Sequence, residues 1–93
     1  MPKYVIERTV PGAGQMDGAA LSAIAGASNE VLRALGPDVQ WVHSYVTDDK
    51  ITCLYIADGP EVIKEHARCG NFPADSIAEV RAVIDPTTAE LAS

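Results

Sequence analysis

Four short stretches of this chain are rich in β-branched and aromatic residues, with polar residues interspersed at or near a period of two. That composition and period are typical of β-strands. The four stretches are residues 4–10, 39–46, 51–57 and 77–84. Between them lie two segments, residues 17–35 and 60–70, whose apolar residues recur at helical spacing. The pattern therefore predicts the order strand, helix, strand, strand, helix, strand.

Local signals mark the ends of both predicted helices. The first starts at Asp17 or Gly18 and stops before the pair Gly36-Pro37, which does not continue a helix. The second, residues 60–70, has a proline in its first position and a glycine at its end. The apolar stripe of the first helix comprises Leu21, Ile24, Ala25, Ser28, Val31, Leu32 and Leu35.

This βαββαβ order is the ferredoxin-like plan of the α+β class. It predicts a four-stranded antiparallel sheet with two helices on one face. The 93 residues are enough for a single domain with one core, and we expect residues 86–93 to form a loose tail.

Two strand pairings are open to the hairpin of residues 39–57. A two-residue loop, Asp48-Asp49, places His43 opposite Leu54. A three-residue loop, residues 48–50, places His43 opposite Tyr55 and Tyr45 opposite Cys53. We favour the three-residue loop, because the hairpin lacks the Asn-Gly or Asp-Gly of a tight turn and because one face then becomes wholly aliphatic. That aliphatic face is Val42, Val46, Leu54 and Ile56, and the opposite face is Trp41, His43, Tyr45, Cys53 and Tyr55.

Composition narrows the range of functions. The formal charge of −6 argues against nucleic acid and anionic membranes as partners. No apolar run approaches the roughly 18 residues that span a bilayer, and the amino terminus has no hydrophobic signal segment, so we expect a cytoplasmic protein. In that compartment the two cysteines are expected to be free thiols.

The sheet face without helices is expected to be an interface. In the favoured register it carries Trp41, Ile51 and Tyr55, and apolar surface of this kind usually marks a contact between proteins. We expect a homodimer that packs two such faces together.

Side chains on the same face predict a metal site. His43 and Cys53 lie diagonally on adjacent strands in the favoured register, and imidazole with thiolate suits nickel, copper or zinc. Tyr45 lies opposite Cys53, and Glu7 or Glu79 supplies an oxygen.

A second pair, His66 and Cys69, is three residues apart on the second helix and is a less favoured site. His66 shares the inner stripe with Val62 and Ile63, which predicts a core-edge histidine bonded to backbone, on the helix side of the sheet.

Several motifs resemble a family of small bacterial proteins long catalogued as a domain of unknown function. They are residues 1–8 (MPKYVIER), Gly36-Pro37 with residues 41–50 (WVHSYVTDDK), Glu65-His66-Ala67, Phe72-Pro73-Ala74 and residues 80–86 (VRAVIDP). The family includes a nickel-binding, nickel-responsive member with a dimeric ferredoxin-like fold. The resemblance implies this fold, a dimer and, where ligands are present, nickel.

Two other kinds of function remain open. Dimeric α/β barrels hold small molecules, and His43, Tyr45, Tyr55 and Glu7 would supply acid and base groups to an enzyme or a small-ligand binder. The alternative is a structural or regulatory dimer without a ligand. No nucleophile–base motif or nucleotide fingerprint is present in the sequence, so an enzyme is the less favoured reading.

Overall fold

The computed structural model describes residues 1–92 and confirms the predicted ferredoxin-like order of elements. The elements are β1 (Lys3–Thr9), α1 (Gly18–Leu35), β2 (Val39–Val46), β3 (Lys50–Ala57), α2 (Pro60–Gly70) and β4 (Ser76–Glu79). Two short 3-10 turns, Ala13–Gln15 and Pro86–Ala92, complete the chain. Within residues 1–92, no helix has both the length and the hydrophobicity needed to cross a bilayer.

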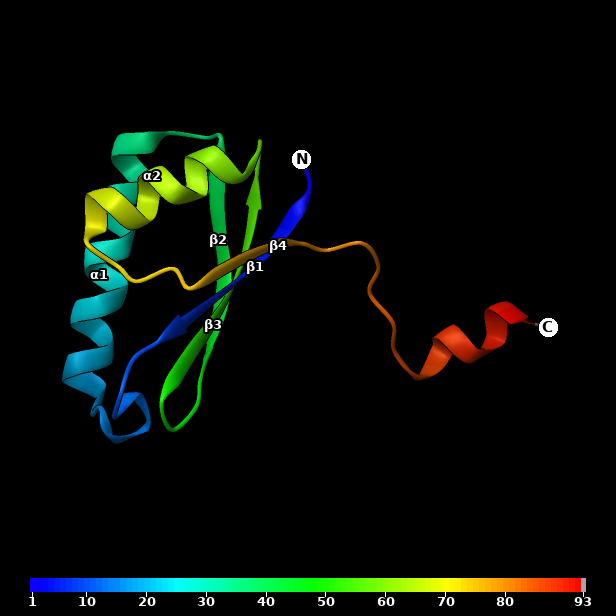
Figure 1. The fold of residues 1–93 in the computed structure, drawn as a ribbon, viewed down its shortest axis with the longest axis horizontal. Coiled ribbons are helices and arrows are strands. Elements are labelled where there is room, and N and C mark those ends of the chain that lie inside the picture. Colours follow the sequence, from blue (N-terminus) through cyan, green and yellow to red (C-terminus); the bar gives the residue numbers. More distant parts are fainter. Residues whose placement is uncertain (93) are drawn as a thin grey trace.

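The four strands form one antiparallel sheet in the order β2-β3-β1-β4, and both helices lie on one side of it (Figure 1). Alternate residues of the central strands are buried beneath the helices: Tyr4, Ile6 and Arg8 of β1, and Ile51, Cys53, Tyr55 and Ala57 of β3. The opposite side, here called the uncovered face, carries Val5, Glu7, His43, Tyr45, Thr52, Leu54 and Ile56.

The helix ends lie where the capping residues predict them. The Asp17 carboxylate accepts a hydrogen bond from the Ala20 N–H at 2.9 Å, which caps the start of α1. Gly36, with φ 84°, ends that helix, and Asn71, with φ 55°, ends α2.

The hairpin between β2 and β3 differs from the prediction. Its loop has two residues, Asp48-Asp49, and is closed by the Thr47 N–H donating to the Lys50 carbonyl at 2.9 Å. His43 therefore lies opposite Leu54, and the predicted pairing of His43 with Tyr55 is wrong.

The segment after β1 holds this tight loop in place. The Val10 N–H donates to the Asp49 carbonyl at 2.8 Å, and the Gly14 N–H donates to the Asp48 carbonyl at 3.0 Å. The Gly12 N–H donates to the Asp49 carboxylate at 3.0 Å. These tertiary hydrogen bonds stabilise a short turn that has no glycine of its own.

An extra residue in β2, Val42, forms a β-bulge. Trp41 pairs with Tyr55 and His43 pairs with Leu54, so two steps along β2 match one step along β3. The extra step brings Trp41 and Ser44 to the same side, and Trp41 Nε1 donates to the Ser44 hydroxyl at 2.9 Å.

The predicted core face is wrong in both strands. In β3 the odd-numbered residues face the helices, so Leu54 and Ile56 lie on the uncovered face, and in β2 the bulge divides the strand between the two faces. A strand with one inserted residue changes faces midway, so no continuous register describes it. The predicted aliphatic set of Val42, Val46, Leu54 and Ile56 is half-buried or exposed. The core instead contains Tyr4, Ile6, Ala13, Val39, Ile51, Cys53, Tyr55, Ala57 and Ile63.

Strand β4 is shorter than the predicted span of residues 77–84. Glu79 pairs with Tyr4, and the Val80 N–H makes one further bond to the Lys3 carbonyl at 2.8 Å. Since β1 begins at Lys3, the ladder between β1 and β4 ends at this bond.

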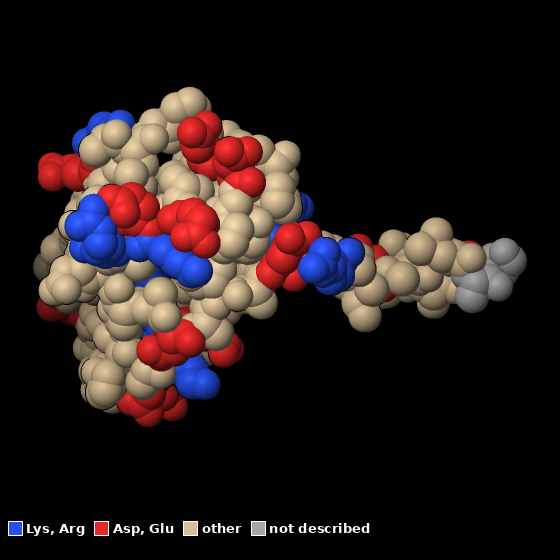
Figure 2. Space-filling model, turned by 45° about the horizontal axis from the view of Figure 1, so that its top comes forward, with Lys and Arg blue, Asp and Glu red and all other residues tan. Residues whose placement is uncertain are grey.

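The residues after β4, 81–92, form an arm that leaves the domain on the side away from the helices (Figure 1). Figure 2 shows the arm standing clear of the rounded body. Its side chains Val83, Ile84 and Leu91 are 73%, 77% and 83% exposed. The radius of gyration of 14.7 Å exceeds the value of about 12 Å expected for a compact domain of this length. Residues 86–92 of the predicted tail form a 3-10 turn on this arm, and Ser93 lies outside the described residues.

Candidate functional site

The uncovered face brings together three of the predicted site residues. His43 lies in one cross-strand row with Leu54 and Val5, and Tyr45 lies in the next row with Thr52 and Glu7. The His43 and Tyr45 rings meet edge to face, with centroids 5.0 Å apart. His43, Tyr45 and Glu7 are all exposed, so this imidazole, phenol and carboxylate are open to a ligand or a partner.

These residues do not complete a metal site within one chain. Strands β2 and β1 flank β3, so His43 and Glu7 are two strand spacings and two residues apart, or roughly 12 Å between Cα atoms. Across residues 1–92, no group of three or more His, Cys, Asp or Glu side chains is placed to hold an ion. A single protomer therefore does not fit the ligand set that nickel requires.

Cys53 belongs to the other side of the sheet, and its predicted pairing with His43 is wrong. It is 4% exposed and lies beside Ile6 beneath the helices, because β3 turns its odd-numbered residues toward the core. The placement of Ile51 and Tyr55 on the uncovered face is wrong for the same reason.

Trp41 is half-buried on the helix side, where it packs against the core, and it too was wrongly placed on the uncovered face. Tyr55 is buried on the helix side of the sheet, so it does not share a surface with His43. The predicted acid–base set of His43, Tyr45, Tyr55 and Glu7 is therefore not assembled on one face.

His66 lies on the helix side of the sheet, as predicted, but it is a core residue and not an edge residue. It is 1% exposed, with Ser28 Oγ 3.1 Å from its Nε2. Its partner is thus a side chain and not the expected backbone. The rings of Tyr55 and Phe72 lie 5.4 Å and 5.3 Å from the imidazole.

Burial and, to a lesser extent, the nearby charge of Arg8 together lower the pKa of His66 to about 4, against a smaller opposing effect of the hydrogen bond with Ser28. The imidazole is therefore neutral near pH 7. Its Nδ1 is buried without a hydrogen-bond partner.

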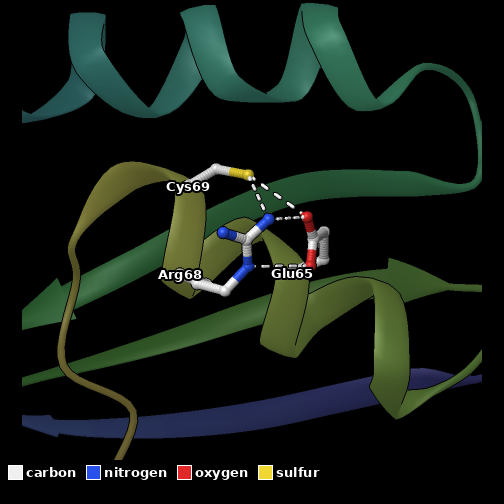
Figure 3. Close-up of polar contacts among 3 residues, drawn as sticks. All are labelled: Glu65, Arg68 and Cys69. Carbon is white, nitrogen blue, oxygen red and sulfur yellow. Dashed lines mark hydrogen bonds and ion pairs between the residues drawn. The ribbon is translucent and has the colours of Figure 1, made fainter.

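Cys69 does not pair with His66, because it lies on the exposed side of α2. Figure 3 shows it beside Glu65 and Arg68, with the sulfur 3.5 Å from a Glu65 carboxylate oxygen and 3.7 Å from Arg68 Nη2. The hydrogen bonds from Arg68 hold the pKa of Glu65 below its usual value. Glu65 and Cys69 are therefore an unfavourable site for a metal cation, because the positive charge of Arg68 lies beside both of these possible ligands.

A second site lies between the helices and the sheet, and the sequence reasoning missed it. It is a cavity of about 380 Å³. Its walls are Arg8, Val10, Leu21, Ile24, Ala25, Ser28, Trp41, Ser44, Val46, Ile51, Cys53, Tyr55, His66, Phe72 and Pro73. Most of these residues are apolar, and Arg8, Ser28, Tyr55 and His66 form a polar cluster among them.

Arg8 is the charged member of this cavity wall and is 5% exposed. Its Nη1 donates to the Pro73 carbonyl, and its Nη2 donates to the Tyr55 hydroxyl at 3.4 Å. The guanidinium carbon lies 5.8 Å from the centre of the Phe72 ring. The sequence does contain a signal for this residue, because Arg8 alternates with Tyr4 and Ile6 on what is otherwise an apolar face.

The Tyr55 hydroxyl beside Arg8 stays protonated at neutral pH. Burial raises its pKa, the charge of an ionised Cys53 would raise it further, and the Arg8 guanidinium only partly offsets these effects. The polar end of the cavity thus combines one fixed positive charge with neutral hydroxyl and imidazole groups.

Comparisons with known proteins agree with this fold. A family model described as nickel responsive protein SCO4226-like matches residues 4–80. The crystal structure of SCO4226 from Streptomyces coelicolor A3(2) superimposes with a TM-score of 0.74 at 16% identity, over 88% of this chain and 99% of that chain. At this identity the structural likeness shows the fold alone. No curated protein matches the sequence.

Proposed function

The chain belongs to the SCO4226-like family of nickel-responsive proteins, as its motifs predicted, and from this premise we propose that it binds nickel as a homodimer. The ion lies between the uncovered faces of two copies. The observation that carries the proposal is the exposed His43 on that face; within residues 1–92 of one protomer, no group of three or more His, Cys, Asp or Glu side chains is placed to hold an ion. We expect the protein to act in the cytoplasm, in nickel sequestration or response.

Apolar surface on the uncovered face supports the dimer. Val5, Leu54 and Ile56 are only half-buried there, and Tyr45 is 64% exposed. Covering such surface with a second copy removes it from water, which is favourable. The arm supports the same assembly, because its three exposed aliphatic side chains leave the domain on the side where the second copy would lie.

The donor chemistry supports a borderline metal ion. Imidazole is a preferred ligand of nickel, copper and zinc, and carboxylates complete many such sites. A two-fold dimer presents every ligand twice, so His43 and Glu7 would be joined by the partner subunit's His43 and the partner subunit's Glu7. The second copy thus supplies the ligands that one protomer lacks.

Nickel titration of untagged protein tests the proposal by calorimetry and native mass spectrometry. Wild type is expected to bind nickel as a dimer, and binding should weaken below about pH 6.5, where protons compete for imidazole. His43→Ala should abolish binding. Two control variants should retain most of the nickel binding: Cys69→Ser, which removes the exposed thiol on α2, and His66→Ala, which removes the buried imidazole.

The outcomes separate the parts of the proposal. If wild type shows neither heat nor a thermal shift with nickel, copper or zinc, the metal site is refuted. If Cys69→Ser is the variant that loses binding, the ion lies on α2 and not on the uncovered face. A wild-type chain that sediments as a monomer at micromolar concentration, with and without nickel, rules out the dimer.

A further inference from the structure

We propose that the cavity between the helices and the sheet binds a small amphipathic monocarboxylate, with the carboxylate on Arg8 and the apolar body along α1. This site is distinct from the proposed nickel site, because the two lie on opposite sides of the sheet. It does not depend on nickel binding or on the dimer.

The size of the cavity sets the size of the ligand. Binding pockets for small molecules begin at roughly 300 Å³, and this cavity measures about 380 Å³. Since one water occupies about 30 Å³ of liquid, the space holds on the order of a dozen non-hydrogen atoms. That is the size of a medium-chain fatty acid or a small aromatic acid.

The buried guanidinium identifies the charge of the ligand. Burying a cation is costly unless an anion pairs with it. The hydrogen-bond acceptors of Arg8 are a carbonyl and a hydroxyl, both neutral. The ion pairs found among residues 1–92 all join exposed side chains elsewhere. The Asp75 carboxylate is near enough for the charge of Arg8 to help lower its pKa, but it accepts its hydrogen bond from the Thr9 N–H. A carboxylate in the cavity would supply a directly paired counter-charge and match the planar fork of the guanidinium.

The remaining polar groups favour one negative charge over two. Tyr55 and Ser28 are neutral donors, and His66 contributes no positive charge near neutral pH. A phosphate dianion would face a single guanidinium. The partnerless Nδ1 of His66 is a further buried polar atom next to the cavity, and native proteins rarely leave such atoms without a partner.

The apolar body has a matching wall. Leu21 and Ile24 line the cavity from α1, yet they are 38% and 36% exposed, and Val46 of β2 is 41% exposed. Leu21 precedes Ser28 by seven residues, which is about 10 Å along the helix axis. An alkyl chain or ring that runs from Arg8 toward Leu21 would cover these side chains.

The net charge of −6 does not oppose this ligand at close range. Exposed charges more than about 10 Å away are largely screened at 0.1 M salt, whereas a buried guanidinium is screened much less. The local charge at the polar end of the cavity therefore decides which ion enters.

Trp41 allows a direct test, because it lines the cavity and is the only tryptophan in the chain. Decanoate is the probe, and 1-decanol is the matched ligand without charge. Decanoate is expected to change Trp41 fluorescence and to release heat in calorimetry, and to bind at least tenfold more tightly than decanol. Both titrations are run with a chelator, so that nickel plays no part.

Variants locate the site. Arg8→Met keeps an unbranched apolar stem and removes the guanidinium charge. It should weaken decanoate binding at least tenfold while leaving decanol binding unchanged. Ala25→Leu fills the cavity from α1 while Arg8 itself is unchanged, and it should abolish binding of both ligands. Ala27→Leu, the same substitution at an exposed position outside the cavity, is the control.

Clear results would overturn the proposal. Neither heat nor a fluorescence change up to about 1 mM decanoate excludes the site. Equal binding of decanoate by wild type and Ala25→Leu places any binding elsewhere. If wild type binds decanoate and decanol with equal affinity, Arg8 does not recognise the carboxylate. This comparison needs only the wild-type protein, so it holds even if Arg8→Met fails to fold.

Discussion

The buried imidazole of His66 predicts a loss of stability on mild acidification. Its pKa is about 4 in the folded protein and 6.5 as the ordinary value. Between these values the unfolded chain binds a proton that the folded chain does not. The free energy of unfolding therefore decreases by about 1.4 kcal/mol for each unit by which the pH is lowered. From pH 7.5 to pH 5 the loss is about 2 kcal/mol. Above about pH 7.5 the imidazole is neutral in both states, and its contribution to stability should be flat.

Other titrating groups do not produce this change. Glu65, Asp75 and Asp85 have lowered pKa values in the folded protein. They contribute stability that is present above their ordinary values of 4.5 and 3.8 and is lost as the pH falls further. Their effect therefore begins where the His66 effect is nearly complete.

Urea unfolding at fixed protein concentration with a chelator measures the effect. At about 1–2 kcal/mol per M of urea, the wild-type midpoint should drop by about 1–2 M between pH 7.5 and pH 5. His66→Gln keeps a polar group near Ser28 but does not titrate, so its midpoint should change little. Because the two proteins differ only at position 66, contributions from all other groups cancel in the comparison. Parallel pH curves for wild type and His66→Gln would show that the imidazole is not the cause.

Two further predictions concern glycines and thiols. A Cβ at Gly70 would overlap the Phe72 ring, so Gly70→Ala should cost about 1–3 kcal/mol of stability. Gly26→Ala, at a helical position where a Cβ meets nothing, should instead add about 0.5–1 kcal/mol. Thermal unfolding compares the two, and a loss at both positions would contradict the packing. In native protein Cys69 should react readily with a thiol reagent and Cys53 only after unfolding, whereas equal rates would mean that the sheet opens.

The fold followed from local chemistry that the sequence displays directly. Proline, glycine and Asp17 mark the helix ends, and the structure places α1 and α2 between those marks. The number and order of strands followed from the stretches of β-branched residues. These features depend on neighbours in the chain, so they can be read without knowing what packs against them.

The register of the hairpin could not be predicted from the local sequence, because the contacts that fix it come from residues distant in the chain. The tight Asp48-Asp49 loop is held by N–H groups of residues 10–14. Val42 is an ordinary strand residue, and its composition does not mark it as a bulge. Central strand β3 carries apolar side chains on both faces, so hydrophobicity alone does not say which face is buried.

The candidate sites were predictable only in part. Alternation correctly placed His43 and Tyr45 on one face, because they are two residues apart and lie beyond the bulge. The partnership of Arg8 with Tyr55 depends on the packing of strands 47 residues apart in sequence. The cavity was hidden because small residues such as Ala25 and Ser28 allow a helix either to approach a sheet or to leave a space beneath it.

The bulge at Val42 also bears on how copies of the chain avoid uncontrolled polymerisation. Strand β2 is an edge of the sheet, and its outer backbone groups are a template on which a strand of another molecule can grow. A bulge interrupts the regular spacing of those groups and increases the local twist, so a straight strand cannot pair along the full edge. Edge-to-edge growth into filaments is thereby disfavoured, which is consistent with the proposed association through the uncovered face.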